Sequence, residues 1–498
     1  MKAKYFLIIL SGFIFQGYVL ALPGDVNENS TIDIIDALLV AQYYVGLNPA
    51  GFNLQAADVN ASGTVDIVDA LLIAEYYVGL ITEFPVQNGV TTHDPEFYRS
   101  NDNYTIHHPF PQAEIIKNRG IRPAVYDQAE MNAHCQKAFE DWVKYWITTD
   151  NCPAGSARPH MGPGPSLPFY AEPYGTISEF IGWGMLVCVL MDNDQNRTRN
   201  LFGLLNSFRK AFTNEYGLMM STVNFHKPMD SYNKDSATEA DENMAMALLM
   251  AHYQWGSNGS SNYLTEAAGL LNSISAHLVE RPAYVLKPAA TWGGSDSLDP
   301  CYYDPMYYPL WYSLTGDSCW TKLDEHYRTL VSFFCSQYGT GLLPEWCRAD
   351  GSSTPAGGNG LGDNSYIFSW DAHQISTKWA IHYAWWGTAE TDIFFKAARM
   401  AAAWVEKEAK GNLSSLVDSY TLDGEPVGTY SYLPAMVGAM GLAGTVSAEH
   451  QDLVNKAYEF LLTLDSGADY NWGNSMGKVV QLLVYSGNFV NFSDTDSE

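Results

Sequence analysis

Two segments near the beginning of the chain place oxygen-bearing side chains at alternating positions, a spacing that suits the ligation of a hard metal ion. They are copies of one repeat with a period of 33 residues, GDVNENSTIDIIDALLVAQYYVGL from Gly24 and ADVNASGTVDIVDALLIAEYYVGL from Ala57. Calcium takes roughly six to eight oxygen ligands, which a loop supplies from positions 1, 3, 5, 7, 9 and 12, with a backbone carbonyl at position 7. A solvated turn rich in Asp and Asn is the alternative, but two copies at one spacing argue against it. The predicted ligands of two calcium ions are Asp25, Asn27, Asn29, Thr31, Asp33 and Asp36 in the first loop, and Asp58, Asn60, Ser62, Thr64, Asp66 and Asp69 in the second.

Each loop runs directly into an amphipathic helix, no helix precedes it, and position 12 is Asp where an EF-hand has Glu. In these features the repeat resembles the type I dockerin family over its whole length, although position 6 is Ser30 in the first loop and Gly63 in the second. The resemblance implies a cohesin partner on a scaffold protein. Dockerins choose that partner largely through loop positions 10 and 11, where exposed aliphatic side chains would form an apolar docking patch. These positions hold Ile34, Ile35, Ile67 and Val68.

Farther along the chain, Glu179 begins an otherwise apolar helical segment, ISEFIGWGMLVCVLM. Its carboxyl is therefore expected in a poorly hydrated pocket at a helix N-terminus. Burial raises the pKa of a carboxyl, as the role of general acid requires, although the helix dipole acts in the opposite direction. The structural alternative is a first-turn Glu that only stabilises the helix.

A second acidic segment, ATEADENMAMALLMAHYQW, spans Ala237 to Trp255 and places Glu239 ahead of an alanine-rich run that predicts a buried helix. Thr238 and Asp241 are expected to form a box-like N-cap for this helix. The segment resembles a motif of glycoside hydrolase family 8, A-[ST]-D-[AG]-D followed by M-A-x-A-L-L-x-A and an aromatic residue. Only the first Asp of that motif differs, because Glu239 replaces it. The resemblance implies that Glu239 contacts the distorted sugar.

The same family carries S-E-G-x-G-Y-G-M, whose Glu is the general acid, and SEFIGWGM at 178–185 resembles it. The family's base Asp lies in Y-D-A-x-R before an aromatic-rich helix, and WDAHQ at 370–374 is the counterpart. The resemblance, to clostridial cellulases over roughly residues 100–490, implies Glu179 as acid and Asp371 as base of an inverting hydrolysis. The two carboxyls of such enzymes lie roughly 6.5–9.5 Å apart, so that a water fits between them. Asp371 is expected to remain ionised in a wetter spot, with Asp304 and Asp363 as alternative bases.

Four positions depart from the family's pattern around the expected cleavage site. Gln374 and Lys378 stand where the family has Arg, which would weaken charge and hydrogen bonding around the base. Ser221 replaces a Trp expected after Gly-Leu-Met, which would remove a platform for stacking a sugar. Glu239 is one methylene longer than the Asp it replaces. These changes point to an altered substrate or to lost activity.

Aromatic side chains make up 14% of the chain, an excess that needs either a large core or a stacking surface. Sugar rings present C–H faces that pack on aromatic faces. Trp292, Tyr302 and Trp370 are therefore predicted to bind substrate, and the first two lie in segments matched to the family. The alternative for each is a position in the core. Further candidates in loops or at helix ends are Trp183, Trp346 and Trp472.

These residues need a framework, and the sequence indicates a helical one. After the repeat, strand-like alternation is nearly absent and helical periodicity recurs. Twelve candidate helices in one domain predict an all-α fold, an (α/α)6 barrel of six inner helices ringed by six outer ones. Long connections such as 280–304 and 339–368 would form the active-site groove at one end. The candidate helices lie near 127–147, 178–191, 196–212, 239–253, 262–278, 305–313, 319–338, 369–386, 388–408, 430–440, 447–463 and 474–485.

The chain is expected to consist of four parts. Residues 1–21 have two lysines, an apolar run and a small final residue, which is typical of a Sec signal peptide cleaved after Ala21. An uncleaved membrane anchor is the alternative, but the run is short and Gln16 interrupts it. Residues 22–82 are the dockerin-like module, 83–100 a linker and 101–490 the catalytic domain. The predicted location is extracellular, with the protein attached to a scaffold.

Charge and cysteine content exclude several other functions. The net charge of −28 argues against nucleic acids and anionic membranes as partners. Seven cysteines are scattered without CxxC spacing, so a zinc site is not expected. Their odd number leaves at least one thiol without a partner inside the chain. No cofactor is expected for catalysis.

The favoured function is hydrolysis of a β-1,4-linked plant polysaccharide, most of all by an endoglucanase acting on cellulose or mixed-linkage glucan. A xylanase or oligoxylanase and a chitosanase are the alternatives among enzymes. The competing class is a scaffold-attached carbohydrate-binding protein whose hydrolase domain has decayed, which the altered residues 221, 239, 374 and 378 keep open.

Overall fold

The computed structural model describes residues 24–27, 29, 31–47, 49–59, 65–81, 84, 98–160, 175–225, 234–259, 261–355, 365–387, 389–428, 434–464 and 476–495. The predicted signal peptide lies outside these residues, as do most of the predicted linker and Asn60, Ser62, Thr64, Asp363 and Trp472. The chain divides into two compact units, Met1–Thr91 and Thr92–Glu498.

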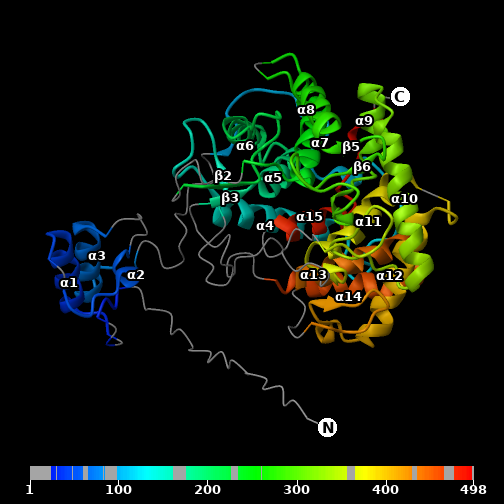
Figure 1. Cartoon of the computed structure of the whole chain (residues 1–498). Coiled ribbons are helices and arrows are strands. Elements are labelled where there is room, and N and C mark those ends of the chain that lie inside the picture. Colours follow the sequence, from blue (N-terminus) through cyan, green and yellow to red (C-terminus); the bar gives the residue numbers. More distant parts are fainter. Residues whose placement is uncertain are drawn as a thin grey trace, which may run out of the picture. The chain divides into compact units, whose positions relative to one another are not determined.

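In the first unit, helices α1 (Ile34–Tyr44) and α3 (Ile67–Tyr77) pack against each other, and the short α2 (Leu54–Ala57) lies between them in the chain (Figure 1). The two long helices begin in the same way. Asp33 Oδ1 accepts the backbone N–H of Ile35 at 2.7 Å, and the corresponding bond in α3 runs from Val68 to Asp66 at the same length. The buried core of this unit is small, and a core of this size commonly needs a metal ion to be stable. Its buried residues are Val26, Ala37, Val40, Ala57, Val59, Ala70, Ile73 and Phe84.

The second unit contains twelve α-helices among its described residues, each overlapping one of the predicted ranges. The all-α prediction is therefore confirmed, and the helices alternate between two rings. The outer helices are amphipathic: α4 (Gln128–Trp146), α6 (Arg199–Ala211), α8 (Tyr263–His277), α10 (Cys319–Tyr338), α12 (Ile393–Ala409) and α14 (Gln451–Leu462). The inner helices are mostly apolar: α5 (Ser178–Leu190), α7 (Thr238–Trp255), α9 (Tyr308–Thr315), α11 (Ile375–Trp386), α13 (Pro434–Leu442) and α15 (Met476–Tyr485).

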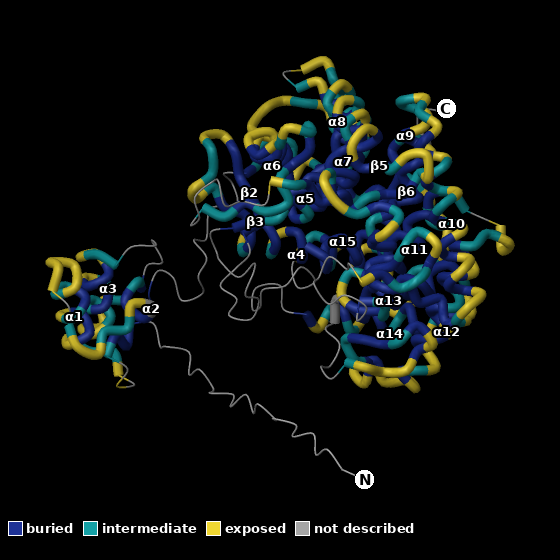
Figure 2. Tube along the Cα trace, viewed as in Figure 1, coloured by how far each residue is buried: buried dark blue, intermediate teal, exposed yellow. Residues whose placement is uncertain are grey.

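The contacts between helices form an (α/α)6 barrel. Helix α15 contacts both α13 and α5, so the inner ring closes between the last helix and the first of that ring. Each inner helix also packs on an outer one, for example α5 on α6, α7 on α8 and α13 on α14 (Figure 1). The exposed stretches follow the outer helices and the connections, whereas α5 and α7 are dark along most of their length (Figure 2). An apolar helix is stable inside the ring because outer helices cover it from water.

Short two-stranded antiparallel sheets and 3-10 turns connect the helices. Two of these sheets lead directly into the segments predicted to carry acid and base, because β3 ends where α5 begins and β7 ends where the 3-10 turn η6 begins. The paired strands are β1 (Ile147–Thr148) with β2 (Arg158–Pro159), β3 (Gly175–Ile177) with β4 (Thr222–Asn224), β5 (Val279–Glu280) with β6 (Val285–Leu286), and β7 (Phe368–Ser369) with β8 (Ser419–Tyr420). The 3-10 turns are η2 (Gln112–Glu114), η4 (Pro300–Tyr302), η6 (Trp370–Gln374), η7 (Leu413–Ser415), η8 (Ala443–Val446), η9 (Ala448–His450) and η11 (Phe492–Thr495).

All seven cysteines lie in the described part of the chain and none is in a disulfide. Six of them are buried, as small apolar residues commonly are, and Cys152 is partly exposed. No helix within the described residues is both long and apolar enough to cross a bilayer.

Candidate active site

Strand β3, paired with β4, leads directly into α5 and places Glu179 in the first turn of that helix. Ser178 donates its backbone N–H to the carbonyl of Ser221 at 2.9 Å, and its hydroxyl to Glu179 Oε2 at 3.1 Å. The apolar helix behind Glu179 removes water from its carboxyl. This burial raises the pKa of Glu179 to about 7, and the nearby charge of Glu239 adds to the effect. Glu179 can therefore hold a proton near neutral pH, as a general acid must.

Glu239 lies in the first turn of α7, whose start is built differently from the prediction. The predicted N-cap box is wrong, because Ala237 is the N-cap and no side chain caps the helix. Thr238 instead donates its hydroxyl to the carbonyl of Lys287 at 2.5 Å, and Asp241 Oδ1 accepts the backbone N–H of Met219 at 3.0 Å. Both side chains hold α7 against neighbouring loops, because this helix end is buried inside the barrel rather than exposed to water.

Several carboxyl side chains, most of them buried, gather around Glu179 and Glu239 and affect one another's charge. We call this group the carboxyl cluster. Three of its members, Glu242, Asp299 and Glu345, were not predicted as site residues. Asp299 Oδ1 accepts the backbone N–H of Cys301 at 2.7 Å, and Glu345 Oε2 accepts the hydroxyl of Ser369 at 2.7 Å. The members of the cluster are Glu179, Glu239, Glu242, Asp299, Asp304, Glu345 and Asp371.

Lys378 on α11 supplies positive charge to this cluster. Its ammonium nitrogen lies 3.1 Å from Glu239 Oε1 and 2.9 Å from Asp304 Oδ1, and it donates to the carbonyl of Cys301. Asp304 was an alternative candidate for the base. The Asp304 side chain is 0% exposed and forms an ion pair with Lys378, so it is not placed to activate a water on a sugar.

Asp371 lies in the turn η6, directly before α11. Burial is the main cause that raises its pKa to about 8, and the nearby charges of Glu239, Glu345 and Glu179 add to this shift. The Asp371 side chain is partly exposed, but its raised pKa differs from the expectation that it remains ionised. The reason is that Lys378 forms its ion pairs with Glu239 and Asp304, and that Gln374, where the family has Arg, brings no charge.

Three of the predicted aromatic side chains surround this cluster in different ways. Trp370 is 52% exposed and has a backbone φ of 37°, an uncommon conformation for a residue other than Gly. Trp292 is 38% exposed and stacks on Trp346, with ring centroids 5.4 Å apart. The hydroxyl of Tyr302 is buried beside carboxyls, and this burial raises its pKa, as do the charges of Glu179 and Asp299. Exposed rings beside buried carboxyls suit the binding of a sugar chain.

Trp183, another aromatic candidate, is a core residue. It is 1% exposed and its ring packs edge-on against Phe489. Helical position explains the difference, since Trp183 lies on the second turn of the inner helix α5 and Trp370 lies in a turn.

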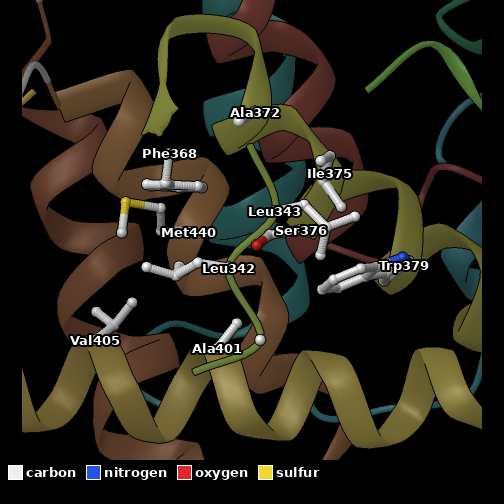
Figure 3. A pocket seen from close by; sticks show the side chains of 11 residues that line it. Leu342, Leu343, Phe368, Ala372, Ile375, Ser376, Trp379, Ala401, Val405 and Met440 are labelled. Carbon is white, nitrogen blue, oxygen red and sulfur yellow. The ribbon is translucent and has the colours of Figure 1, made fainter. Parts of the chain in front are cut away.

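A small cavity lies behind the turn that carries Asp371 (Figure 3). Apolar side chains such as Leu342, Phe368 and Met440 line it, and the hydroxyl of Ser376 is a polar group among them. Its volume of about 10 Å³ is room for no more than about one water. The cavity therefore belongs to the packing beneath η6 and is too small for a sugar ring.

The first predicted calcium loop brings its oxygen atoms together through short turns. Asp25 Oδ1 accepts the backbone N–H of Asn29 at 2.9 Å, and Asn29 Oδ1 accepts that of Thr31 at 2.8 Å. Asp36 accepts the backbone N–H groups of Val26 at 2.8 Å and Asp33 at 2.9 Å. No group of three or more His, Cys, Asp or Glu side chains in the described residues converges on a metal position. The predicted set of calcium ligands therefore depends also on Asn side chains and backbone carbonyl oxygens. A donor set made of oxygen alone fits a hard ion such as calcium.

Comparison with known proteins agrees with both parts of this description. The model of glycosyl hydrolases family 8 matches residues 127–478, and that of the dockerin type I domain matches residues 23–76. Endoglucanase 2 of Ruminiclostridium josui is 33% identical over 394 residues, which cover 78% of this chain and 79% of that protein.

Two solved structures show the same fold. A beta-1,3-1,4-glucanase from Paenibacillus sp. X4 aligns with a TM-score of 0.67 at 23% identity, covering 77% of this chain and 99% of that one. A reducing-end-xylose releasing exo-oligoxylanase aligns with a TM-score of 0.60 at 17% identity, covering 74% and 97%. Type I dockerins bind calcium and attach enzymes to extracellular cellulosomes through cohesins. From the family matches and the helical barrel together, the chain belongs to glycoside hydrolase family 8 and carries an N-terminal type I dockerin.

Proposed function

We propose that this glycoside hydrolase is a secreted endoglucanase which cleaves a β-1,4-linked glucan with inversion, using Glu179 as the acid and Asp371 as the base. The observation that carries the proposal is the surroundings of Glu179. It lies at the start of an apolar inner helix, its pKa is raised to about 7 by burial, and it influences the charge of Asp371. Inversion needs two carboxyls in different roles, and each of these two follows directly after a strand of a separate two-stranded sheet.

In the proposed reaction Glu179 donates its proton to the leaving glycosidic oxygen. The hydroxyl of Ser178 holds the carboxyl in place through Oε2. Asp371, once ionised, takes a proton from a water that attacks the opposite face of the sugar. Glu239 contacts the sugar between them and helps to hold it distorted, and Trp370 and Trp292 offer ring faces to neighbouring sugars.

The proton on the proposed base must leave before that base can act. Burial raises the pKa of Glu179 to about 7 and that of Asp371 to about 8, and the charge of Glu179 adds to the shift at Asp371. The reactive form has Glu179 protonated and Asp371 ionised. The raised pKa therefore suits the role of Glu179 and opposes that of Asp371.

The substrate is proposed as glucan first because the endoglucanase and the beta-1,3-1,4-glucanase above carry that chemistry in their names. Xylan or xylo-oligosaccharides are the second candidate, favoured by the structural likeness to an exo-oligoxylanase. A chitosanase, which rests on the family resemblance alone, is the third. The altered residues Glu239, Gln374, Lys378 and Ser221 favour, as a further alternative, a protein that binds carbohydrate without cleaving it.

One assay separates these candidates. The purified chain is incubated with carboxymethylcellulose, mixed-linkage glucan, xylan and chitosan, and released reducing sugar is measured. The proposal expects the highest rate on one of the two glucans, with a rapid fall in viscosity that marks internal cleavage. Binding to a glucan without any release of sugar would reject the enzyme proposal in favour of a decayed hydrolase.

For the first unit, we propose two calcium ions and a cohesin contact through Ile34, Ile35, Ile67 and Val68. These four side chains are about half exposed and, with Leu38 and Leu71, border an apolar groove of about 550 Å³ between α1 and α3. An exposed apolar patch of this kind marks a protein contact site. The ligands are proposed as the twelve residues predicted from the repeat. Export through a signal peptide cleaved after Ala21 would place the groove outside the cell, and N-terminal sequencing of the secreted protein would test the cleavage site.

A further inference from the structure

The ammonium of Lys378 is buried among three oxygen atoms. It is 1% exposed and donates a hydrogen bond to the carbonyl of Cys301. It also forms ion pairs with Glu239 Oε1 at 3.1 Å and with Asp304 Oδ1 at 2.9 Å. A buried ammonium held by three such partners has little freedom to move, because leaving them would leave its charge uncompensated.

These three oxygen atoms belong to two parts of the barrel, the start of α7 and the connection that leads into α9. Glu239 is in the first turn of α7, Cys301 is in η4, and Asp304 is between η4 and α9. Lys378 itself is on α11, seven residues after Asp371 along the continuous segment of η6 and α11. The ammonium therefore connects the segment that carries the proposed base with the segment that carries Glu239.

Neutralisation of charge alone does not account for this arrangement. One carboxylate, that of Asp304, is enough to balance the charge of Lys378, and it is completely buried at the shorter distance. Glu239 is a second carboxylate on the same cation, so the group of three keeps a net negative charge. Because Asp304 holds the ammonium from one side, the ammonium can hold the flexible side chain of Glu239 from the other.

We propose that Lys378 is a positioning residue, which fixes the carboxylate of Glu239 at the place where that carboxylate meets the reacting sugar. The inference rests on the role proposed above for Glu239. A carboxylate that is free to rotate would be misplaced by an ångström or more, and such misplacement can cost about 100-fold in rate.

Three variants separate positioning from simple charge balance. Lys378→Met removes the cation and leaves Glu239 and Asp304 buried without it. Lys378→Met combined with Asp304→Asn removes one positive and one negative charge, so the charge balance returns while Glu239 still has no lysine. Asp304→Asn alone keeps the pair of Lys378 and Glu239, and its amide oxygen can still accept a hydrogen bond from the ammonium. Each variant is measured for thermal unfolding by circular dichroism, and for kcat and KM on the best glucan of the substrate assay.

The proposal expects Lys378→Met to be unstable and to lose about 100-fold in kcat, with KM changed much less. The double variant should unfold close to the wild-type temperature and still lack about 100-fold in kcat. Asp304→Asn should keep kcat within about threefold of wild type. If the double variant recovers kcat as well as stability, the proposal is overturned. The proposal is also overturned if Asp304→Asn loses as much kcat as Lys378→Met does. Failure of the double variant to fold would show that Lys378 holds the fold, and would overturn it too.

A crystal structure of the double variant makes the result independent of the proposed function. The proposal expects the Glu239 carboxylate to leave its wild-type position or to become disordered. An unmoved carboxylate overturns the role of Lys378 even in an active enzyme. If the wild-type chain cleaves none of the four polysaccharides, the proposed function fails, and the position of Glu239 in the variant still decides the inference.

Discussion

At the scale of single residues, the site is dominated by a shortage of positive charge. Burial and mutual repulsion raise the pKa of Glu179, Asp304 and Asp371, and Lys378 opposes this effect for the latter two. A cluster with more carboxyls than cations holds protons at neutral pH, because each further ionisation adds repulsion in a medium of low polarity. This property favours an acid in the site, and it makes the base the more demanding of the two roles.

Removing either proposed catalytic carboxyl should abolish turnover while the sugar still binds. Glu179→Gln cannot donate a proton of suitable acidity and Asp371→Asn cannot accept one, and a general acid or base contributes about 10²–10⁴-fold in rate. Reducing-sugar release and calorimetric binding of a cello-oligosaccharide measure the two effects. Glu140→Gln, at an exposed carboxyl on α4, is the matched control and should keep full activity. A full-rate Asp371→Asn variant, or product NMR that shows a retained anomeric configuration, would contradict the assignment.

The pH dependence of kcat/KM should follow the protonation of Glu179 and Asp371. The reactive form carries one proton on the pair. Below about pH 7 a second proton binds and no base remains, whereas above about pH 8 both carboxyls are ionised and no acid remains. A bell-shaped profile with its maximum between about pH 7 and about pH 8 is therefore expected. A maximum near pH 4–5, typical of unperturbed carboxyls, would show that the cluster is better solvated than this structure has it.

At the scale of elements, periodicity predicted the helices well because their apolar residues repeat at the spacing of a helix face. The sequence pattern also predicted that Glu179 lies at the start of an apolar helix, because this residue and the apolar run are neighbours in the chain. It failed for the start of α7, where Thr238 and Asp241 bond to Lys287 and Met219 from other segments. The ion pairs of Lys378 could not be predicted from the sequence either. Contacts between segments distant in the chain leave no periodic signal, so the raised pKa of Asp371 could not be foreseen.

Close packing of the inner helices makes one glycine of α5 sensitive to substitution. A Cβ at Gly182 would lie 2.7 Å from the carbonyl oxygen of Ala240 on α7, which is backbone and cannot turn away. Gly182→Ala should therefore lower the free energy of unfolding by about 1–3 kcal/mol. Gly203→Ala on the outer helix α6 is the matched control, because nothing lies within 4 Å of its Cβ. That control should raise stability by up to about 1 kcal/mol, since Ala favours a helix over Gly. Equal melting temperatures for the two variants would contradict close contact between α5 and α7.

At the scale of the whole molecule, the chain joins two units with different sources of stability. The barrel packs two rings of helices around one large apolar core. The dockerin buries a core of a few residues, and its first loop folds around Asp25 and Asp36, which accept backbone N–H groups. A small unit of this kind gains its stability from ligand binding, which for one site adds about 4 kcal/mol when the free ion exceeds its Kd about 1,000-fold. Conditions that remove the ion should therefore affect the two units separately.

Chelation of calcium should unfold the dockerin and leave the barrel folded and active. Without the ion, the oxygen ligands of each loop, Asp25, Asp33 and Asp36 among them in the first, have no cation to hold them together, and the small core offers little stability of its own. In excess EDTA the full chain should lose binding to a cohesin and should be cleaved rapidly by protease within residues 24–81, while hydrolysis of soluble carboxymethylcellulose stays unchanged. Excess Ca²⁺ should restore cohesin binding and protease resistance. The matched control is mock chelation with EDTA already saturated by Ca²⁺, which should change neither property. Unchanged circular dichroism and cohesin binding after true chelation would contradict a calcium-dependent module, and parallel loss of hydrolysis would show that the barrel also depends on the ion.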